Sequence, residues 1–193
     1  MDLVKITKKL YPIEIDLLYA TKKNFTGKQI YKKKDCYLHK IAIPSFEKSI
    51  ELAAKLNLKL KIFDAFRPTE AQWKLWEHTP NENFIAHPEK GSPHSRGVAI
   101  DLTLINKNNY ELNMGTNFDN FSSKSFHGNM EISKDAQKIA LTDFLFSILR
   151  QNLSSFLAQH LIESHRQYSL TMLPHIAFLF DFPTCQFFLK NKY

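Results

Sequence analysis

The chain has 193 residues, 44% of them hydrophobic, and a formal net charge of +7. This length fits one domain of ordinary size, and the apolar content is ample for a core, which excludes a disordered or fibrous chain. The excess charge comes from the first 66 residues, where fourteen lysines face seven acidic residues. Turn and aromatic residues interrupt the lysine clusters, which is typical of a solvated face, so we expect no nucleic-acid partner.

The cysteines and the short apolar runs bear on the location of the protein. Cys36 and Cys185 form no CxxC pair, so neither a zinc ribbon nor a disulfide framework is indicated, and a reducing cytoplasm fits best. We expect Cys36 to be a small core residue. The first twenty residues lack the apolar segment of a secretory signal, and no run approaches the ~18 residues of a membrane span. The sequence therefore predicts a cytoplasmic protein with no membrane partner.

Residues 45–57 are the first segment with a clear helical pattern. Ser45 stands where it can cap the start of a helix, and Asn57 is a suitable stop. Apolar residues recur on one side of this helix, namely Phe46, Leu52, Ile50, Ala53, Ala54 and Leu56.

The next two elements follow directly. In the segment LKLKIFD, residues 58–64, three apolar residues alternate with Lys59 and Lys61, which predicts a half-buried strand; the apolar residues are Leu58, Leu60 and Ile62. Thr69 and Gln72 have the spacing of a capping box that opens a helix through Trp76. Trp73 and Trp76 are three residues apart and are expected to pack on one face of that helix.

Residues 92–104, SPHSRGVAIDLTL, combine a turn with an apolar strand pattern. The alternation places Val98, Ile100, Leu102 and Leu104 on one face and Ala99, Asp101 and Thr103 on the other. The order helix, strand, helix, loop, strand predicts a single α+β domain with a central antiparallel sheet and flanking helices.

The same stretch carries a candidate metal half-site. Asp101 lies inside an apolar strand and needs a partner to offset its desolvation, and His94 lies in the preceding turn, where Gly97 allows a bend. Histidine nitrogen and carboxylate oxygen are standard zinc ligands, and catalytic zinc takes three protein ligands and leaves one position to water. The spacing is equally compatible with a structural histidine and a salt-bridged aspartate.

Five short motifs occur along the chain: NFTG at 24–27, CYL at 36–38, DAFRP at 64–68, SPHSRGVAIDLTL at 92–104 and MGTNFDNF at 114–121. In order and spacing they resemble the zinc D-alanyl-D-alanine dipeptidases associated with vancomycin resistance, over roughly residues 10–138. The resemblance implies an α+β fold related to the zinc D,D-carboxypeptidases and the hedgehog signalling domain. It also implies one Zn²⁺ per chain, a small dipeptide substrate and a part in cell-wall precursor metabolism.

The resemblance assigns roles to individual residues. It implies that His94 and Asp101 bind the zinc and that Arg67 stabilises the transition state, whereas the alternative for Arg67 is a surface arginine after a strand. It implies a weaker role for Ser92 in holding the ammonium end of the substrate. These residue types suit amide hydrolysis, because zinc lowers the pKa of its bound water toward ~7 and a guanidinium can stabilise an oxyanion. His127 is expected to be an ordinary loop residue.

The resemblance ends near Lys138. The family completes its site with E-W-W-H, which supplies the general base and the third zinc ligand, and this chain has no such motif. Glu163 and His165 are weak candidates, because they are two residues apart rather than three and would diverge by about 200° on a helix. The C-terminal histidines His160 and His175 have no more support.

The sequence therefore divides into a dipeptidase-like zinc domain, residues 1–138, and a divergent tail, residues 139–193. The tail contains no glycine and carries half of the phenylalanines, and a shifted reading frame is our hypothesis for its origin. Two functions follow: zinc-dependent hydrolysis of D-Ala-D-Ala, or an inactive relic of the family that lacks the base and the third ligand.

Overall fold

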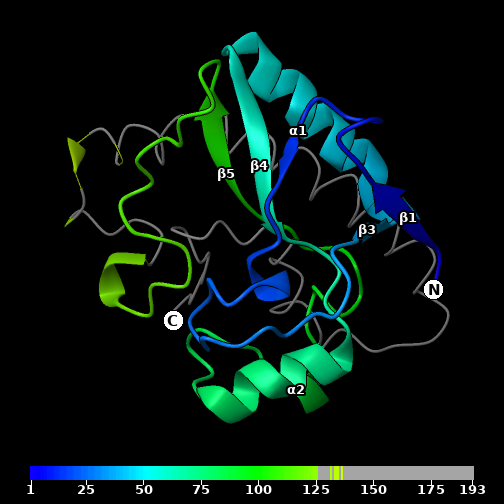
Figure 1. The fold of residues 1–193 in the computed structure, drawn as a ribbon, viewed down its shortest axis with the longest axis vertical. Helices are drawn as coiled ribbons and strands as arrows, with labels where there is room; N and C mark the ends of the chain where they lie inside the picture. Colours follow the sequence, from blue (N-terminus) through cyan, green and yellow to red (C-terminus); the bar gives the residue numbers. More distant parts are fainter. Residues whose placement is uncertain (126–130, 132, 135, 137–193) are drawn as a thin grey trace, which may run out of the picture.

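The computed structural model describes residues 1–125 together with residues 131, 133, 134 and 136. Its elements, in chain order, are β1 (Leu3–Ile6), β2 (Glu14–Ile15), η1 (Leu18–Ala20), β3 (Cys36–His39), η2 (Lys40–Ala42), α1 (Ile43–Lys55), β4 (Leu58–Asp64), α2 (Thr69–His78), η3 (Pro88–Lys90), β5 (Asp101–Asn106) and η4 (Ser123–Ser125). This content confirms the predicted α+β class. Figure 1 shows the sheet and α1 in one half of the molecule and α2 in the other.

The central sheet is mixed, which corrects the antiparallel sheet expected from the sequence. Its strand order is β2-β4-β5, and β4 and β5 pair antiparallel from Leu58↔Asn106 to Asp64↔Asp101. β2 pairs parallel to β4, because the chain returns between them through a crossover that contains α1. β1 and β3 form a separate antiparallel ribbon.

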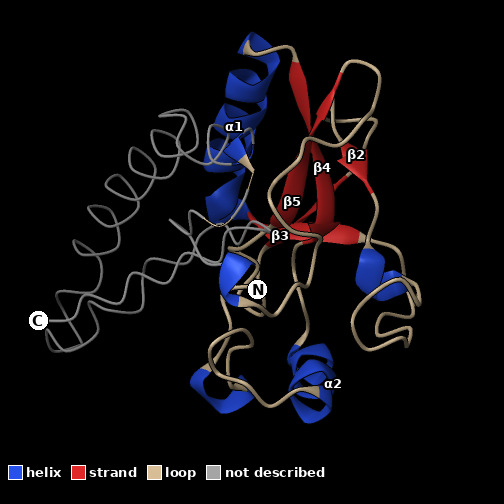
Figure 2. Ribbon diagram, turned by 90° about the vertical axis from the view of Figure 1, so that its left-hand side faces the viewer, coloured by secondary structure: helices blue, strands red, loops and turns tan. Residues whose placement is uncertain are grey.

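Helix α1 covers one face of this sheet (Figure 2). The core between them contains apolar side chains from α1, β4 and β5, namely Phe46, Ile50, Ala53, Leu60, Ile62, Leu102 and Leu104. The predicted cap at Ser45 is wrong, because η2 leads straight into a helix that starts at Ile43 with a proline in its first turn. The predicted stop is confirmed, since Asn57 has a left-handed φ of 58° directly before β4.

Strand β5 begins at Asp101, three residues later than the pattern indicated. The amide of Val98 donates instead to the carbonyl of Pro93 at 3.0 Å, so residues 98–100 belong to the end of the turn. Within the strand the two faces alternate as predicted, yet Asp101 and Thr103 are as buried as their apolar neighbours. At these two positions the second face of the sheet is therefore also shielded from bulk solvent.

Helix α2 contributes Ala71 and Leu75 to a second apolar cluster, in which they pack with Tyr19, Ile30 and Ile85. The predicted capping box is wrong, because α2 has no side-chain cap and Gln72 is turned away from the helix end. Trp73 and Trp76 pack as expected, with ring centroids 5.8 and 4.6 Å from that of His87.

Two further expectations have a clear outcome in the described residues. Cys36 is a buried core residue with a free thiol, as predicted. Among the residues placed by the structure, no helix is both long and apolar enough to cross a membrane. His127 lies outside the described residues, as does the whole of 139–193.

Candidate active site

The site forms where β4 ends and β5 begins. Because the two strands are antiparallel, Asp64 at the end of β4 pairs directly with Asp101 at the start of β5. Arg67 follows β4 by three residues, and its backbone amide donates to the carbonyl of His94 at 3.0 Å. The sheet thereby joins the DAFRP motif to the SPHSRGVAIDLTL motif, between the two halves seen in Figure 1.

The turn that carries His94 depends on Gly97. This glycine has φ 72°, and a Cβ built on it would lie 3.0 Å from the backbone nitrogen of His39 and 3.0 Å from a methyl group of Leu3. Its carbonyl accepts from the same His39 amide at 2.8 Å. The turn is therefore pressed against the β1–β3 ribbon, which holds His94 in a buried place.

We expect Gly97→Ala to destabilise the protein by more than the ~1–2 kcal/mol that a left-handed conformation costs an L-residue, because the added methyl group also meets backbone. Gly27→Ala is the matched control, since Gly27 has φ 64° and open space around its Cβ position. Denaturant unfolding of both variants measures the difference. Equal losses would show that the close approach to His39 has no energetic weight.

The imidazole of His94 is oriented by a backbone carbonyl. Its Nδ1 lies 2.8 Å from the oxygen of Ala65, and since a carbonyl can only accept, Nδ1 carries the proton of the neutral ring. The other nitrogen, Nε2, faces Asp101, with 3.3 Å between Nε2 and Oδ1. Two ligands about 2.0–2.2 Å from a tetrahedral zinc stand about this far apart, so the pair fits the metal.

Asp64 completes a buried group with these two residues, whose possible ligand atoms all lie within 4.8 Å of one another. Its Oδ1 accepts from the hydroxyl of Tyr31 at 2.7 Å, and its Oδ2 accepts from Nε of Arg67 at 2.8 Å. Oδ2 also lies 3.6 Å from Nδ1 of His94, on the side of the ring that faces Ala65. We therefore assign Asp64 to holding Arg67 rather than to the metal.

Arg67 is 7% exposed, so it is not the surface arginine of the alternative interpretation. Its Nη2 lies 2.7 Å from Asp64 and 3.1 Å from Asp101. Its guanidinium also lies over the ring of Tyr19, 5.0 Å from the centroid. Burial acts to lower the pKa of Arg67, but Asp64 and the other neighbours hold the pKa well above its ordinary value, so the charge is permanent.

Three carboxyl groups of the site, those of Asp64, Asp101 and Asp119, have raised pKa values, and burial is the main cause in each. Burial raises the pKa of Asp101 to about 7, against the opposing effect of Arg67. Burial likewise raises the pKa of Asp119 to about 7, although a hydrogen bond from Tyr19, 2.8 Å from its Oδ1, acts to lower it. The ring of Tyr19 that carries this hydroxyl is the one under Arg67, so Asp119 is linked to the Arg67 cluster through a single side chain.

We expect Asp119→Asn to stabilise the protein at pH 8 and to leave its stability at pH 4 nearly unchanged. With a pKa of about 7 in the folded state, the carboxyl stays protonated between pH ~4 and 7 while the unfolded chain loses its proton, so wild-type stability falls over that window. An amide removes this loss and still accepts from Tyr19.

Thermal unfolding in chelator at both pH values tests this expectation, and a gain of ~1 kcal/mol would raise Tm by about 2–4 °C in a chain of this size. Asp35→Asn is the control, because hydrogen bonding to Lys5 lowers the pKa of that partly exposed carboxyl and no gain is expected. An Asp119→Asn variant no more stable than wild type at pH 8 would contradict the prediction.

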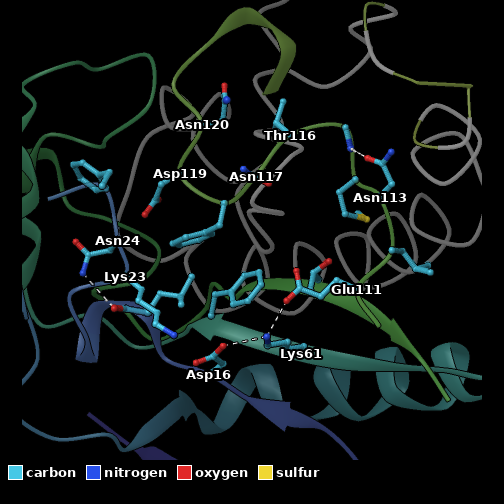
Figure 3. Close-up of a pocket in the computed structure, with 18 of the residues that line it drawn as sticks. Asp16, Lys23, Asn24, Lys61, Glu111, Asn113, Thr116, Asn117, Asp119 and Asn120 are labelled. Carbon is cyan, nitrogen blue, oxygen red and sulfur yellow. Dashed lines mark hydrogen bonds and ion pairs between the residues drawn. The ribbon is translucent and has the colours of Figure 1, made fainter. Parts of the chain in front are cut away.

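A cavity of about 860 Å³ opens on the sheet face opposite α1 (Figure 3). Lys61 lies on its floor and bridges Asp16 at 3.0 Å and Glu111 at 2.8 Å, while Asp119 lies on the opposite side from these charges in Figure 3. Thr103 also lines it, on the same side of β5 as Asp101. The cavity therefore continues the sheet face on which the buried cluster lies.

Sequence reasoning named His94, Asp101 and Arg67, and the structure brings these three residues together. Ser92 is nearby but 2% exposed, and its Oγ accepts from the amide of His94 at 3.2 Å, so it supports the turn. Four further residues of the site were not anticipated, namely Asp64, Asp119, Tyr19 and Gln72. Asp64 and Asp119 lie inside the DAFRP and MGTNFDNF motifs, which was the signal available for them.

Comparison with known proteins agrees with this geometry. The M15 peptidase family model, described as D-ala-D-ala dipeptidase, matches residues 1–153. The chain is 40% identical over 137 residues to the D-alanyl-D-alanine dipeptidase of Escherichia coli (strain K12), an alignment that covers 71% of each protein. It is 32% identical over 143 residues to that of Enterococcus faecalis (strain ATCC 700802 / V583), covering 63% of this chain and 71% of the relative.

A third relative aligns over more of the chain. The D-alanyl-D-alanine dipeptidase of Streptomyces coelicolor (strain ATCC BAA-471 / A3(2) / M145) is 28% identical over 211 residues, which cover 94% of this chain and 98% of the relative. The chain is thus an M15 peptidase, a class of metallopeptidases, and within that class it belongs to the D-ala-D-ala dipeptidase family. The resemblance drawn from the five motifs is confirmed.

Proposed function

We propose that this protein hydrolyses the D-alanyl-D-alanine dipeptide in a zinc-dependent reaction, as part of cell-wall precursor metabolism in the cytoplasm. The observation that carries the proposal is the pair formed by Nε2 of His94 and Oδ1 of Asp101, 3.3 Å apart, with Nη2 of Arg67 3.1 Å from the other oxygen of Asp101. The buried carboxylate of Asp101 thus belongs to the proposed metal site and at the same time pairs with the permanent positive charge of Arg67.

The residues of the site divide the work of amide hydrolysis. His94 and Asp101 hold the metal, and the hydrogen bond from Nδ1 of His94 to Ala65 fixes the orientation of the imidazole. A zinc ion bound there supplies an activated water, because it lowers the pKa of that water toward ~7. Arg67 stabilises the negative charge that develops on the carbonyl oxygen of the scissile amide, since it cannot lose its proton.

Asp119 is the residue best suited to the ammonium group of a dipeptide. Its carboxylate is buried, so it is costly to keep charged unless a cation lies beside it. Asp119 also lies on the cavity wall and is linked to Arg67 through Tyr19. Ser92 is less suited than the resemblance implied, because its hydroxyl already serves the His94 amide. The substrate would then lie with its ammonium end toward Asp119 and its scissile amide toward Arg67.

The second candidate function is an inactive member of the family. It is favoured by the missing E-W-W-H motif, which leaves the general base and the third protein ligand unassigned, with Glu163 and His165 as weak candidates outside the described residues. We keep the division into a zinc domain, 1–138, and a divergent tail, 139–193, as part of this candidate. The family match extends to residue 153, so the boundary is itself a prediction.

Zinc titration of the full chain together with a D-Ala-D-Ala hydrolysis assay separates the two functions. The enzyme should bind one Zn²⁺ per chain, release D-alanine and lose this activity in chelator, with L-Ala-L-Ala as the control dipeptide. Turnover within the ordinary range of ~1–10³ per second would support the enzyme. Zinc binding without hydrolysis would support the inactive relative. A chain that neither binds zinc nor hydrolyses the dipeptide would refute the proposed metal site as well.

A further inference from the structure

Gln72 is a buried polar residue to which the proposed reaction gives no role. It lies in the first turn of α2 and is 1% exposed. Its Oε1 accepts from Nη1 of Arg67 at 2.9 Å, and its Nε2 donates to the carbonyl of Ala86 at 2.8 Å. We propose that Gln72 is a positioning residue that fixes the plane of the Arg67 guanidinium, an inference that rests on the proposed function for the role of Arg67.

The two hydrogen bonds leave Gln72 a single orientation. The carbonyl of Ala86 can only accept, so the amide nitrogen of Gln72 must face Ala86 and the amide oxygen must face Arg67. Because the amide cannot turn over without losing both bonds, its acceptor is fixed in space. Arg67 therefore meets a preorganised partner rather than a mobile one.

Gln72 holds the side of the guanidinium that no carboxylate in the described part of the chain reaches. Asp64 binds Nε and Nη2, Asp101 binds Nη2, and Gln72 binds Nη1. The ring of Tyr19 lies against the face of the group. A rotation of the guanidinium about its long axis would break the bond to Gln72, so the contacts on both edges and one face together define one plane.

The neutrality of Gln72 matters for the chemistry. Arg67 already shares its charge with Asp64 and Asp101, and a third carboxylate at Nη1 would compete with negative charge on a substrate. An amide oxygen supplies the acceptor without adding charge. Arg67 thus remains oriented and keeps more of its attraction for a developing oxyanion.

A purely structural role would act through Ala86 alone, by joining α2 to the segment before η3. Two variants separate the roles. Gln72→Met loses both hydrogen bonds, whereas Gln72→Glu keeps an acceptor for Arg67 and loses the donor to Ala86. Both should lose thermal stability to a similar extent, but only Gln72→Met should release Arg67.

Nitrogen-15 NMR of the arginine side chains reads out Arg67 directly in the full chain. The chain has four arginines, and the Arg67 signals are assigned by their absence from an Arg67→Lys sample. In the wild type the held guanidinium should give separate Nη1 and Nη2 signals. These signals should merge or broaden in Gln72→Met and stay separate in Gln72→Glu.

Gln29→Met is the matched control, because Gln29 also donates to a backbone carbonyl, that of Tyr31, but is exposed and does not contact Arg67. Should Gln72→Met fail to fold, Gln72→Asn gives the same prediction, since its amide is one methylene too short to reach both partners. Two outcomes would overturn the proposal. One is that the Nη1 and Nη2 signals of Arg67 stay separate in Gln72→Met, and the other is that they are lost in Gln72→Glu as fully as in Gln72→Met.

Kinetics provide the second measurement. Gln72→Met should lower kcat about 10- to 100-fold and leave KM nearly unchanged, because a displaced Arg67 acts mainly on charge that develops in the transition state. An unchanged kcat would also overturn the proposal. A wild-type chain that hydrolyses no dipeptide while its Arg67 signals respond as expected would refute the proposed function and support the positioning of Arg67.

Discussion

Replacing His94 with alanine should abolish zinc binding and, with it, dipeptide hydrolysis. His94 supplies the nitrogen that faces Asp101, and its own orientation is fixed by Ala65, so its removal takes away one of the two proposed ligands. The loss of an outer partner of a metal ligand costs ~10- to 100-fold in affinity, and the loss of the ligand itself should exceed that. Isothermal titration with Zn²⁺ measures the change.

His78→Ala is the matched control, because His78 lies at the exposed end of α2 and contacts only Thr79 and Phe25 among the interactions observed there. Its zinc affinity should equal that of the wild type. Circular dichroism of both variants shows whether the fold persists, since His94 is buried and its removal also leaves a small cavity. Tight zinc binding by folded His94→Ala would mean that the metal lies elsewhere in the chain.

The pair His94 and Asp101 could be found from the sequence because both residues lie in one short motif, and β-alternation placed Asp101 away from the apolar face. Arg67 could be linked to them only through the resemblance. Its distance from His94 in space is set by the pairing of β4 with β5, which brings the end of one strand to the start of the other. No local pattern reports such a pairing.

Gln72 illustrates why local patterns mislead at a functional site. Its spacing from Thr69 matches a capping box, which would have placed its side chain at the start of α2. The buried guanidinium of Arg67 and the carbonyl of Ala86 offer it stronger partners, and the helix begins without a side-chain cap. Gln72 could either cap the helix or bond to buried polar groups, and it bonds to the buried groups because these are costly to leave without a hydrogen bond.

The fold was predicted where alternation was long and missed where it was short. The first five residues of β4 carry a clear period of two, and the strand was found. β2 has only two residues, too few for any periodicity, and it is the strand that makes the sheet mixed. The helix over 45–57 was found, but its first turn was missed because η2 and the proline determine where it starts.

Replacing Arg67 with lysine should lower kcat by about 10²- to 10³-fold, the usual effect of removing one donor to an oxyanion, while KM changes little. A lysine keeps the charge but not the planar fork, so it cannot bind Asp64, Asp101 and Gln72 at once. The charge would remain near Asp64, the fully buried partner, and move away from the substrate. Initial rates of D-alanine release over a range of dipeptide concentrations give both constants.

Arg96→Lys is the control for this change, because Arg96 lies in the same turn as His94 and is exposed. Its kcat should match that of the wild type. Zinc affinity should be unchanged in Arg96→Lys and should fall by no more than ~10- to 100-fold in Arg67→Lys, which loses an outer partner of Asp101 but no metal ligand. Assays at saturating Zn²⁺ therefore separate a defect in transition-state stabilisation from a damaged metal site. If Arg67→Lys turns over as fast as the wild type, the buried guanidinium serves only to neutralise Asp64 and Asp101, and its role is in the fold rather than in the reaction.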